Sequence, residues 1–163
     1  MQEALLAGKH VFVEKPLAMT LESLAAIEST YQLATLSGKP LQLMVGFNRR
    51  FAPHIQTMKR LLDVIKVPKS FIITVNAGRI PAQHWVHDTM VGWGRIIGEA
   101  CHFIDLLRYL IGEKIVSIQA QSLLDANNEQ ATKDTTTIGL GFADGSLGTI
   151  HYFANGASVL LKS

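Results

Sequence analysis

The first third of the chain carries two short apolar runs separated by an amphipathic segment. The runs at 10–14 and 41–47 predict buried strands, and apolar residues at helical spacing from Leu21 to Gly38 predict a helix between them. A strand, a helix and a second apolar strand in this order are typical of a parallel βαβ unit. Residues 2–8 predict the end of an earlier helix that leads into the first strand.

The pattern changes after residue 47. Pro53 opens a predicted helix with one apolar face over 53–65, and a second helix is predicted over 95–110. Strands are predicted from runs of apolar and β-branched residues at 69–77, 115–124, 135–142 and 147–154. The last two runs flank an Asp-Gly pair, which is a strong hairpin signal. Helices followed by hairpin-connected strands predict an α+β domain, and we expect its four strands to form one antiparallel sheet.

The predicted helices cover only one face of this sheet. Along 135–142, small or polar positions alternate with apolar positions, whereas neither face of 147–153 is fully polar. We therefore expect an open face whose apolar patch exceeds the few hundred Å² that monomers usually tolerate. Such a patch favours self-association, most simply as a two-fold dimer that packs sheet on sheet.

The composition limits the class of protein. The chain has 163 residues, of which 48% are hydrophobic and 17% charged, so it can build a hydrophobic core and does not resemble a disordered segment. Its net charge of +2 is too balanced for a surface that follows nucleic-acid phosphates. Apolar runs are too short for a membrane span, and the first ten residues lack the pattern of a signal peptide. The single cysteine, Cys101, fits a reducing compartment, so we expect a cytoplasmic protein.

Three segments, at 8–16, 45–53 and 94–105, together resemble the Gfo/Idh/MocA family of NAD(P)-dependent sugar and cyclitol dehydrogenases. The resemblance implies an N-terminal Rossmann domain and a C-terminal α+β domain with an open sheet, through which members often oligomerise. On this basis, residues 1–47 are expected to be the C-terminal remnant of a dinucleotide-binding domain. Residues 48–163 are expected to be the substrate and oligomerisation domain.

One element of a dinucleotide-binding fold is absent from the sequence. A Rossmann domain opens with a strand, a Gly-x-Gly-x-x-Gly turn and a helix whose N-terminus faces the pyrophosphate. The nearest glycine triplet, Gly92, Gly94 and Gly98, has the wrong interval and follows a loop. We therefore expect a fragment that lacks roughly half of its Rossmann domain, stops inside a C-terminal strand, binds NAD or NADP poorly and is inactive alone.

Lys15 follows the first predicted strand, and ligands of open α/β sheets bind at the carboxyl ends of strands. The resemblance implies that its ammonium group hydrogen-bonds the hydroxyl that becomes a carbonyl and stabilises the developing charge on that oxygen. Without the family resemblance, Lys15 would be interpreted as an ordinary solvated lysine that pairs with Glu14.

His102 lies in the helix predicted at 95–110, with Glu99 three residues before it and Asp105 three residues after it. Residues three apart share a helix face, so these side chains would form an acid–His–acid stripe. By resemblance, His102 is the general base that takes the hydroxyl proton. The family usually has an aspartate four residues before this histidine, where Gly98 stands here, so either Glu99 takes over its role or the acid is lost. Without the family pattern, His102 would be interpreted as a hydrogen-bonded histidine of the helix with no catalytic function.

Cofactor and substrate contacts are also implied by the resemblance. The expected cofactor contacts come from Glu14, Lys15, Pro16 and Arg49, and the expected substrate contacts from Asn76, His84, Trp85 and Asp105. Two of these residues have an equally good alternative interpretation: Arg49 as an ordinary surface arginine, and Trp85 as a residue of the hydrophobic core.

A metal site and two protein functions are weighed on the sequence. The run from His84 to Asp88 contains His-x-x-His-Asp, but zinc needs three or four ligands and the only thiol is distant, so no metal site is expected. The principal hypothesis is a fragment of an NAD(P)-dependent dehydrogenase that oxidises a secondary alcohol of a sugar, cyclitol or related polyol. The alternative is a non-catalytic dimerisation or binding module that uses the open sheet.

Overall fold

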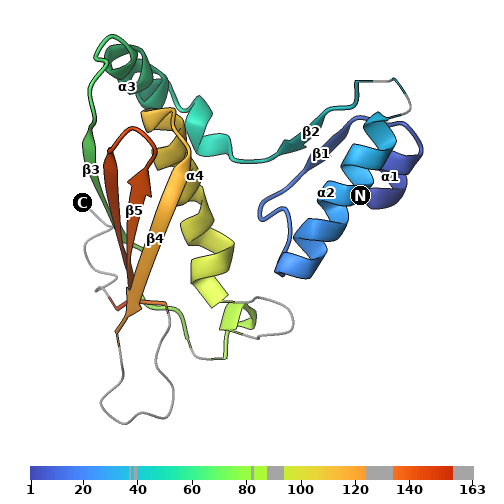
Figure 1. The fold of residues 1–163 in the computed structure, drawn as a ribbon. Helices are drawn as coiled ribbons and strands as arrows, with labels where there is room; N and C mark the ends of the chain where they lie inside the picture. The colour runs from blue at the N-terminus through green and yellow to red at the C-terminus, as the bar shows by residue number, and fades with distance from the viewer. Residues whose placement is uncertain (37, 39, 82, 88–93, 124–133, 156–163) are drawn as a thin grey trace. The chain divides into compact units, whose positions relative to one another are not determined.

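The computed structural model describes the chain except residues 37, 39, 82, 88–93, 124–133 and 156–163 (Figure 1). The chain forms two compact units, Met1–Asn48 and Arg49–Ser163, which are considered separately. Of the described helices, none is long and apolar enough to cross a bilayer.

The first unit contains the predicted parallel βαβ arrangement. Its elements are α1 (Gln2–Leu6), β1 (Val11–Val13), α2 (Leu21–Thr35) and β2 (Leu43–Val45). The two strands pair in parallel, and both are shorter than the apolar runs that predicted them. A small core of Leu5, Ala34 and Leu41 lies between the helices and the start of the second strand. Thr20 caps α2, because its side-chain oxygen accepts a hydrogen bond from the backbone N–H of Ser23.

The second unit is an α+β domain with one four-stranded sheet. It begins with a 3₁₀ turn, η1 (Asn48–Phe51), and the helix α3 (Pro53–Asp63). The remaining elements are β3 (Ser70–Asn76), η2 (Trp85–His87), the π-helical turn η3 (Ile96–Ala100), α4 (Cys101–Ile111), β4 (Ile115–Ser122), β5 (Thr136–Phe142) and β6 (Leu147–Phe153).

The sheet is mixed rather than wholly antiparallel. Its strand order is β3-β6-β5-β4, in which β4, β5 and β6 form antiparallel pairs. β3 pairs with β6 in parallel, from Ser70 opposite Leu147 to Asn76 opposite Phe153. The expectation of a single antiparallel sheet was therefore wrong for β3. The Asp-Gly signal correctly predicted the β5–β6 hairpin but carried no information about the direction of the strand that joins its free side.

Helix α4 covers one face of the sheet (Figure 1). The buried core joins this helix to β5 and β6 and consists of Ala100, Phe103, Leu107, Ile111, Ile138, Leu140, Phe142, Ile150 and Tyr152. The approach is close enough that a Cβ atom on Gly148 would lie 2.7 Å from Cδ1 of Leu107. Helix α3 packs against α4 and has no fully buried residue of its own, so α4 provides the main cover.

The opposite face of the sheet is not covered by any helix among the described residues. The alternation predicted along β5 is confirmed, because Ile138 and Leu140 are buried while Thr137 and Gly139 lie on the open face. On β6, the open face receives Leu147, Thr149, His151 and Phe153. The apolar residues Ile150 and Tyr152 point into the core, whereas Leu147 and Phe153 lie among the polar side chains of the open face.

Candidate active site

The helix that carries His102 does not begin as a regular α-helix. The sequence predicted one helix over 95–110, whereas the structure has the π-helical turn η3 followed by α4. Such turns are rare and often occur at functional sites. Hydrophobic spacing cannot distinguish one π turn from the first turn of an α-helix, which is why the sequence did not predict it.

His102 and Asp105 both lie on α4 and are both buried, with 9% and 8% of their surface exposed. Asp105 accepts two hydrogen bonds from Arg50, one from Nε to Oδ2 at 2.6 Å and one from Nη2 to Oδ1. The hydrogen bond to Asp105 is the main reason why the pKa of the Arg50 guanidinium is raised. A carboxylate held by two parallel N–H groups has a fixed orientation.

Arg49, expected at the cofactor, is stacked over an aromatic ring of the same unit. Its guanidinium carbon lies 4.5 Å from the ring centroid of Phe103, the residue next to His102. Arg50 lies similarly over Tyr109, at 5.6 Å. The two arginines that follow β2 are thus bound to the helix that carries His102.

Glu99 contacts different partners. Its Oε1 lies 3.5 Å from Nε of Arg95, and its Oε2 accepts a hydrogen bond from the hydroxyl of Tyr152. Tyr152 is fully buried, and burial together with the Glu99 carboxylate raises its pKa well above the ordinary value. The phenol therefore remains a hydrogen-bond donor across the neutral and mildly alkaline range.

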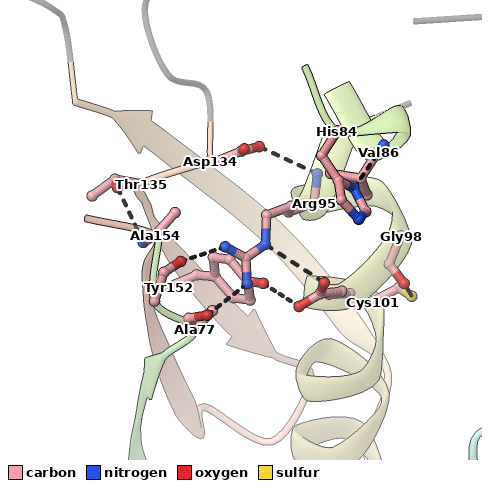
Figure 2. A network of polar contacts seen from close by, with 12 residues as sticks. Ala77, His84, Val86, Arg95, Gly98, Cys101, Asp134, Thr135, Tyr152 and Ala154 are labelled. Carbon is pink, nitrogen blue, oxygen red and sulfur yellow. Dashed lines mark hydrogen bonds and ion pairs between the residues drawn. The ribbon is translucent and has the colours of Figure 1, made fainter. Parts of the chain in front are cut away.

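Arg95 is the centre of this network (Figure 2). The side chain is 4% exposed and donates from Nη1 to the carbonyl oxygen of Gly78 at 2.6 Å and from Nη2 to that of Ala77 at 3.0 Å. Its backbone N–H donates to Oδ1 of Asp134 at 3.2 Å. These bonds join the start of the π-helical turn to the segment after β3 and to the residues before β5.

The predicted acid–His–acid stripe is therefore divided between two sets of partners. Glu99 is held by Arg95 and Tyr152, while Asp105 is held by Arg50. The sequence analysis missed Arg95 and Tyr152 as members of the site. Their only available signals were a charged residue at the start of the helix and a tyrosine on the apolar side of β6, and neither indicates a partner.

In the first unit, Glu14, Lys15 and Pro16 follow β1 at its carboxyl end. The peptide bond between Lys15 and Pro16 is cis. The Glu14 side chain lies close to Gly46, which follows β2: a Cβ atom on this glycine would be 3.1 Å from Oε2 of Glu14. The carboxyl ends of both parallel strands thus bring a carboxylate, a lysine and a glycine backbone to one edge, where open α/β sheets bind ligands.

The expected substrate residues lie in different places within the second unit. Asn76 ends β3 on the open face of the sheet, opposite the face that α4 covers, so the structure does not bring it to His102. His84 and Trp85 are adjacent and exposed, with ring centroids 5.6 Å apart. Since Trp85 is 63% exposed, it is not the core residue that the alternative interpretation required.

No metal-binding cluster of three His, Cys, Asp or Glu residues occurs among the described residues. Asp88, the third residue of the possible zinc motif, lies outside them, as does Gly92 of the glycine triplet. Glu14 and Lys15 provide one anionic and one cationic group at the strand edge, which suits polar parts of a dinucleotide. They do not provide the glycine turn that binds a pyrophosphate.

Residues 55–158 match the GFO/IDH/MocA C-terminal domain. The chain belongs to the Gfo/Idh/MocA family. The uncharacterized oxidoreductase YrbE of Bacillus subtilis is 28% identical over 91% of this chain and 43% of its own length. An inositol 2-dehydrogenase of Rhizobium meliloti is 31% identical over 85% of this chain and 41% of its own length.

Solved structures of the Gfo/Idh/MocA family have the same fold. A putative myo-inositol dehydrogenase from Sinorhizobium meliloti superposes with a TM-score of 0.74 at 25% identity, over 95% of this chain and 46% of that one. The WlbA dehydrogenase of Bordetella pertussis, in complex with NADH and UDP-GlcNAcA, has a TM-score of 0.73 at 24% identity, over 96% and 49%. This chain thus spans less than half the length of these relatives.

Proposed function

We propose that this chain is part of an NAD(P)-dependent dehydrogenase that oxidises a secondary alcohol of a sugar, cyclitol or related polyol. The observation that carries the proposal is a buried histidine, His102, on a helix of a Gfo/Idh/MocA C-terminal domain. Relatives named as inositol 2-dehydrogenases, including that of Rhizobium meliloti and a myo-inositol 2-dehydrogenase of Thermotoga maritima, support the substrate class.

The chemistry that we propose uses two residues of this chain. When bound, NAD or NADP supplies the acceptor for the hydride that leaves the carbinol carbon. His102 takes the proton from the hydroxyl group of the substrate. The Lys15 ammonium group donates a hydrogen bond to the same oxygen and stabilises its negative charge as the carbonyl forms. The products are a ketone, a reduced nicotinamide and a protonated imidazole.

The remaining contacts are assigned by physical suitability. Glu14, Lys15 and Pro16 are proposed to contact the cofactor, since they lie at the carboxyl edge of the parallel strands. Arg49 is proposed to reach the cofactor from its position over Phe103. For the substrate we retain His84 and Trp85, because an exposed indole can pack on a sugar ring and an imidazole can bond a hydroxyl.

The experiment is a hydride-transfer assay with matched variants. The protein is a chimera in which this chain replaces the matching segment of the Rhizobium meliloti inositol 2-dehydrogenase, and reduction of NAD and NADP is followed with a panel of cyclitols and aldoses. Lys15→Ala and His102→Gln should each lower kcat by about 10²-fold or more. The exposed residues Lys9 and His54 provide the control variants, Lys9→Ala and His54→Gln, which should retain activity. Full activity of Lys15→Ala and His102→Gln would exclude the assignment.

A second function is proposed for the open face of the sheet. Its described residues include no Asp, Glu, Lys or Arg. Among them are Thr74, Thr137, Thr149 and Gln119, together with the apolar Ile72, Leu147 and Phe153. Depletion of charge is typical of interface centres. We propose that this face pairs with a second copy of the chain, which sedimentation at tens of micromolar would detect as a dimer. We also propose a cytoplasmic location, since the single cysteine requires no oxidising compartment.

A further inference from the structure

His151 differs from its neighbours on the open face of the sheet because it can change its charge near neutral pH. It lies on β6, which is an inner strand between β3 and β5. Among the described residues of the open face, it is the one side chain that titrates between about pH 5 and 8, and no Asp, Glu, Lys or Arg accompanies it. Thr74 of β3 and Thr137 of β5 stand directly opposite it on either side, and neither is charged.

The contacts of the His151 ring within one chain tolerate both of its protonation states. Its Nδ1 lies 3.1 Å from Oγ1 of Thr137. A threonine hydroxyl can donate to a neutral ring nitrogen or accept from a protonated one. The ring also stacks with that of Phe153, at a centroid separation of 5.8 Å and an interplanar angle of 16°, and aromatic rings attract cations. Since the imidazole is only partly buried, a single chain can carry it in the charged form.

The same charge is unfavourable when a second copy covers the face. A face without Asp, Glu, Lys or Arg is complementary to itself, which favours a second copy over a charged partner. In a two-fold pair, each copy brings its own His151 to the interface and offers no carboxylate from the described residues of that face as a counter-ion. An unpaired charge loses its hydration on burial, and like charges in one interface repel each other.

We propose that His151 makes self-association through the open face dependent on pH, so that two copies pair while the imidazole is neutral and separate when it gains a proton. The inference rests on the function proposed for the open face and names the residue that regulates it. Protonation weakens the pair without unfolding either copy, since Thr137 and Phe153 hold the ring in both states.

The test compares sedimentation of the 163-residue chain at pH 8 and pH 5, with circular dichroism to verify that the fold is kept. The dimer dissociation constant of the original chain should rise by about tenfold or more at pH 5. His151→Gln keeps a hydrogen-bonding side chain that cannot be protonated, so its dissociation constant should be the same at both pH values. His151→Thr, which suits a strand, replaces it if His151→Gln does not fold. His54→Gln, at an exposed histidine of α3, is the matched control and should keep the original pH dependence.

Two charge insertions identify the associating face. Ile72→Glu alters the open face, and Ile118→Glu alters the other face of the sheet, at residues that are 73% and 62% exposed. At pH 8, Ile72→Glu should abolish the dimer and Ile118→Glu should retain it. A monomeric original chain at pH 8, or a dimer that Ile72→Glu leaves intact, contradicts the function proposed for the open face and the inference with it. A dimer that Ile72→Glu abolishes but that persists unchanged at pH 5, or that dissociates at pH 5 in His151→Gln as well, overturns the inference alone.

Discussion

The hydroxyl group of Tyr152 donates a hydrogen bond to the carboxylate of Glu99. This bond connects the covered face of β6 to the π-helical turn that precedes α4. Glu99 therefore belongs to a network around the buried guanidinium of Arg95, and this network fixes the start of the helix on which His102 lies.

Replacing Tyr152 with phenylalanine tests the energetic value of this bond. Tyr152→Phe keeps the ring in the core and removes only the donor, so we expect a loss of about 1 kcal/mol in the free energy of unfolding. Urea denaturation at pH 7 provides the measurement. A loss above about 3 kcal/mol would indicate that the ring itself is displaced.

The same hydroxyl predicts a dependence of stability on alkaline pH. Because the pKa of Tyr152 is raised in the folded chain, this group stabilises the fold fully below its ordinary value of 10.0, and its contribution declines as the pH rises above 10.0, where the unfolded chain releases the phenol proton. Unfolding free energies measured from pH 8 to pH 11 should therefore fall less in Tyr152→Phe than in the original chain.

Among the charged residues of this network, Arg95 is predicted to cause the largest loss of stability when it is replaced. Arg95→Met would leave the carbonyl oxygens of Ala77 and Gly78 without their donor, and we expect a loss of about 3 kcal/mol in the free energy of unfolding. Lys59→Met, at the partly exposed ion pair with Asp63 on α3, should cost less, about 1 kcal/mol. Equal effects of the two variants in urea denaturation would contradict the role of Arg95.

Two glycines on neighbouring strands form a matched pair. A Cβ atom on Gly148 would lie 2.7 Å from Leu107, whereas on Gly139 the nearest atom is the backbone oxygen of Gln119 at 4.0 Å. Gly148→Ala should therefore destabilise the fold by about 1–3 kcal/mol through overpacking against α4. Gly139→Ala, on the open face, should be neutral or slightly stabilising. Thermal denaturation of the two variants decides between these outcomes.

The 163-residue chain is expected to bind NAD and NADH weakly. The glycine turn and helix N-terminus that bind a pyrophosphate do not occur in its sequence, although Glu14 and Lys15 lie at a strand edge suited to ligands. Calorimetric titration should give a dissociation constant well above the micromolar range. Micromolar binding would show that other residues of the chain replace the pyrophosphate site.

Much of the fold was predictable from periodicity. The parallel βαβ unit, the β5–β6 hairpin and the covered face of β5 follow from apolar spacing and turn residues, which are local properties. The direction of β3 was not predictable, because the alternation of Phe71, Ile73 and Val75 is the same for a parallel and an antiparallel neighbour.

The site was less accessible to sequence reasoning. The family resemblance indicated His102 and its flanking acids, of which Glu99 lies in η3 and Asp105 in α4. Their partners come from distant segments: Arg50 is 55 residues from Asp105, and Tyr152 is 53 residues from Glu99. No local pattern encodes such pairs, since they depend on how η1 and β6 pack against the helix.

The parallel pairing of β3 and β6 also constrains when the sheet can form. Lys69 and Ser146, which join the starts of these strands, are 77 residues apart in the chain. Closing a loop of this length is entropically costly, and contacts of long sequence separation slow folding. During synthesis, β3 leaves the ribosome long before its partner β6. The backbone N–H and C=O groups of β3 therefore remain unpaired until β6 has also emerged.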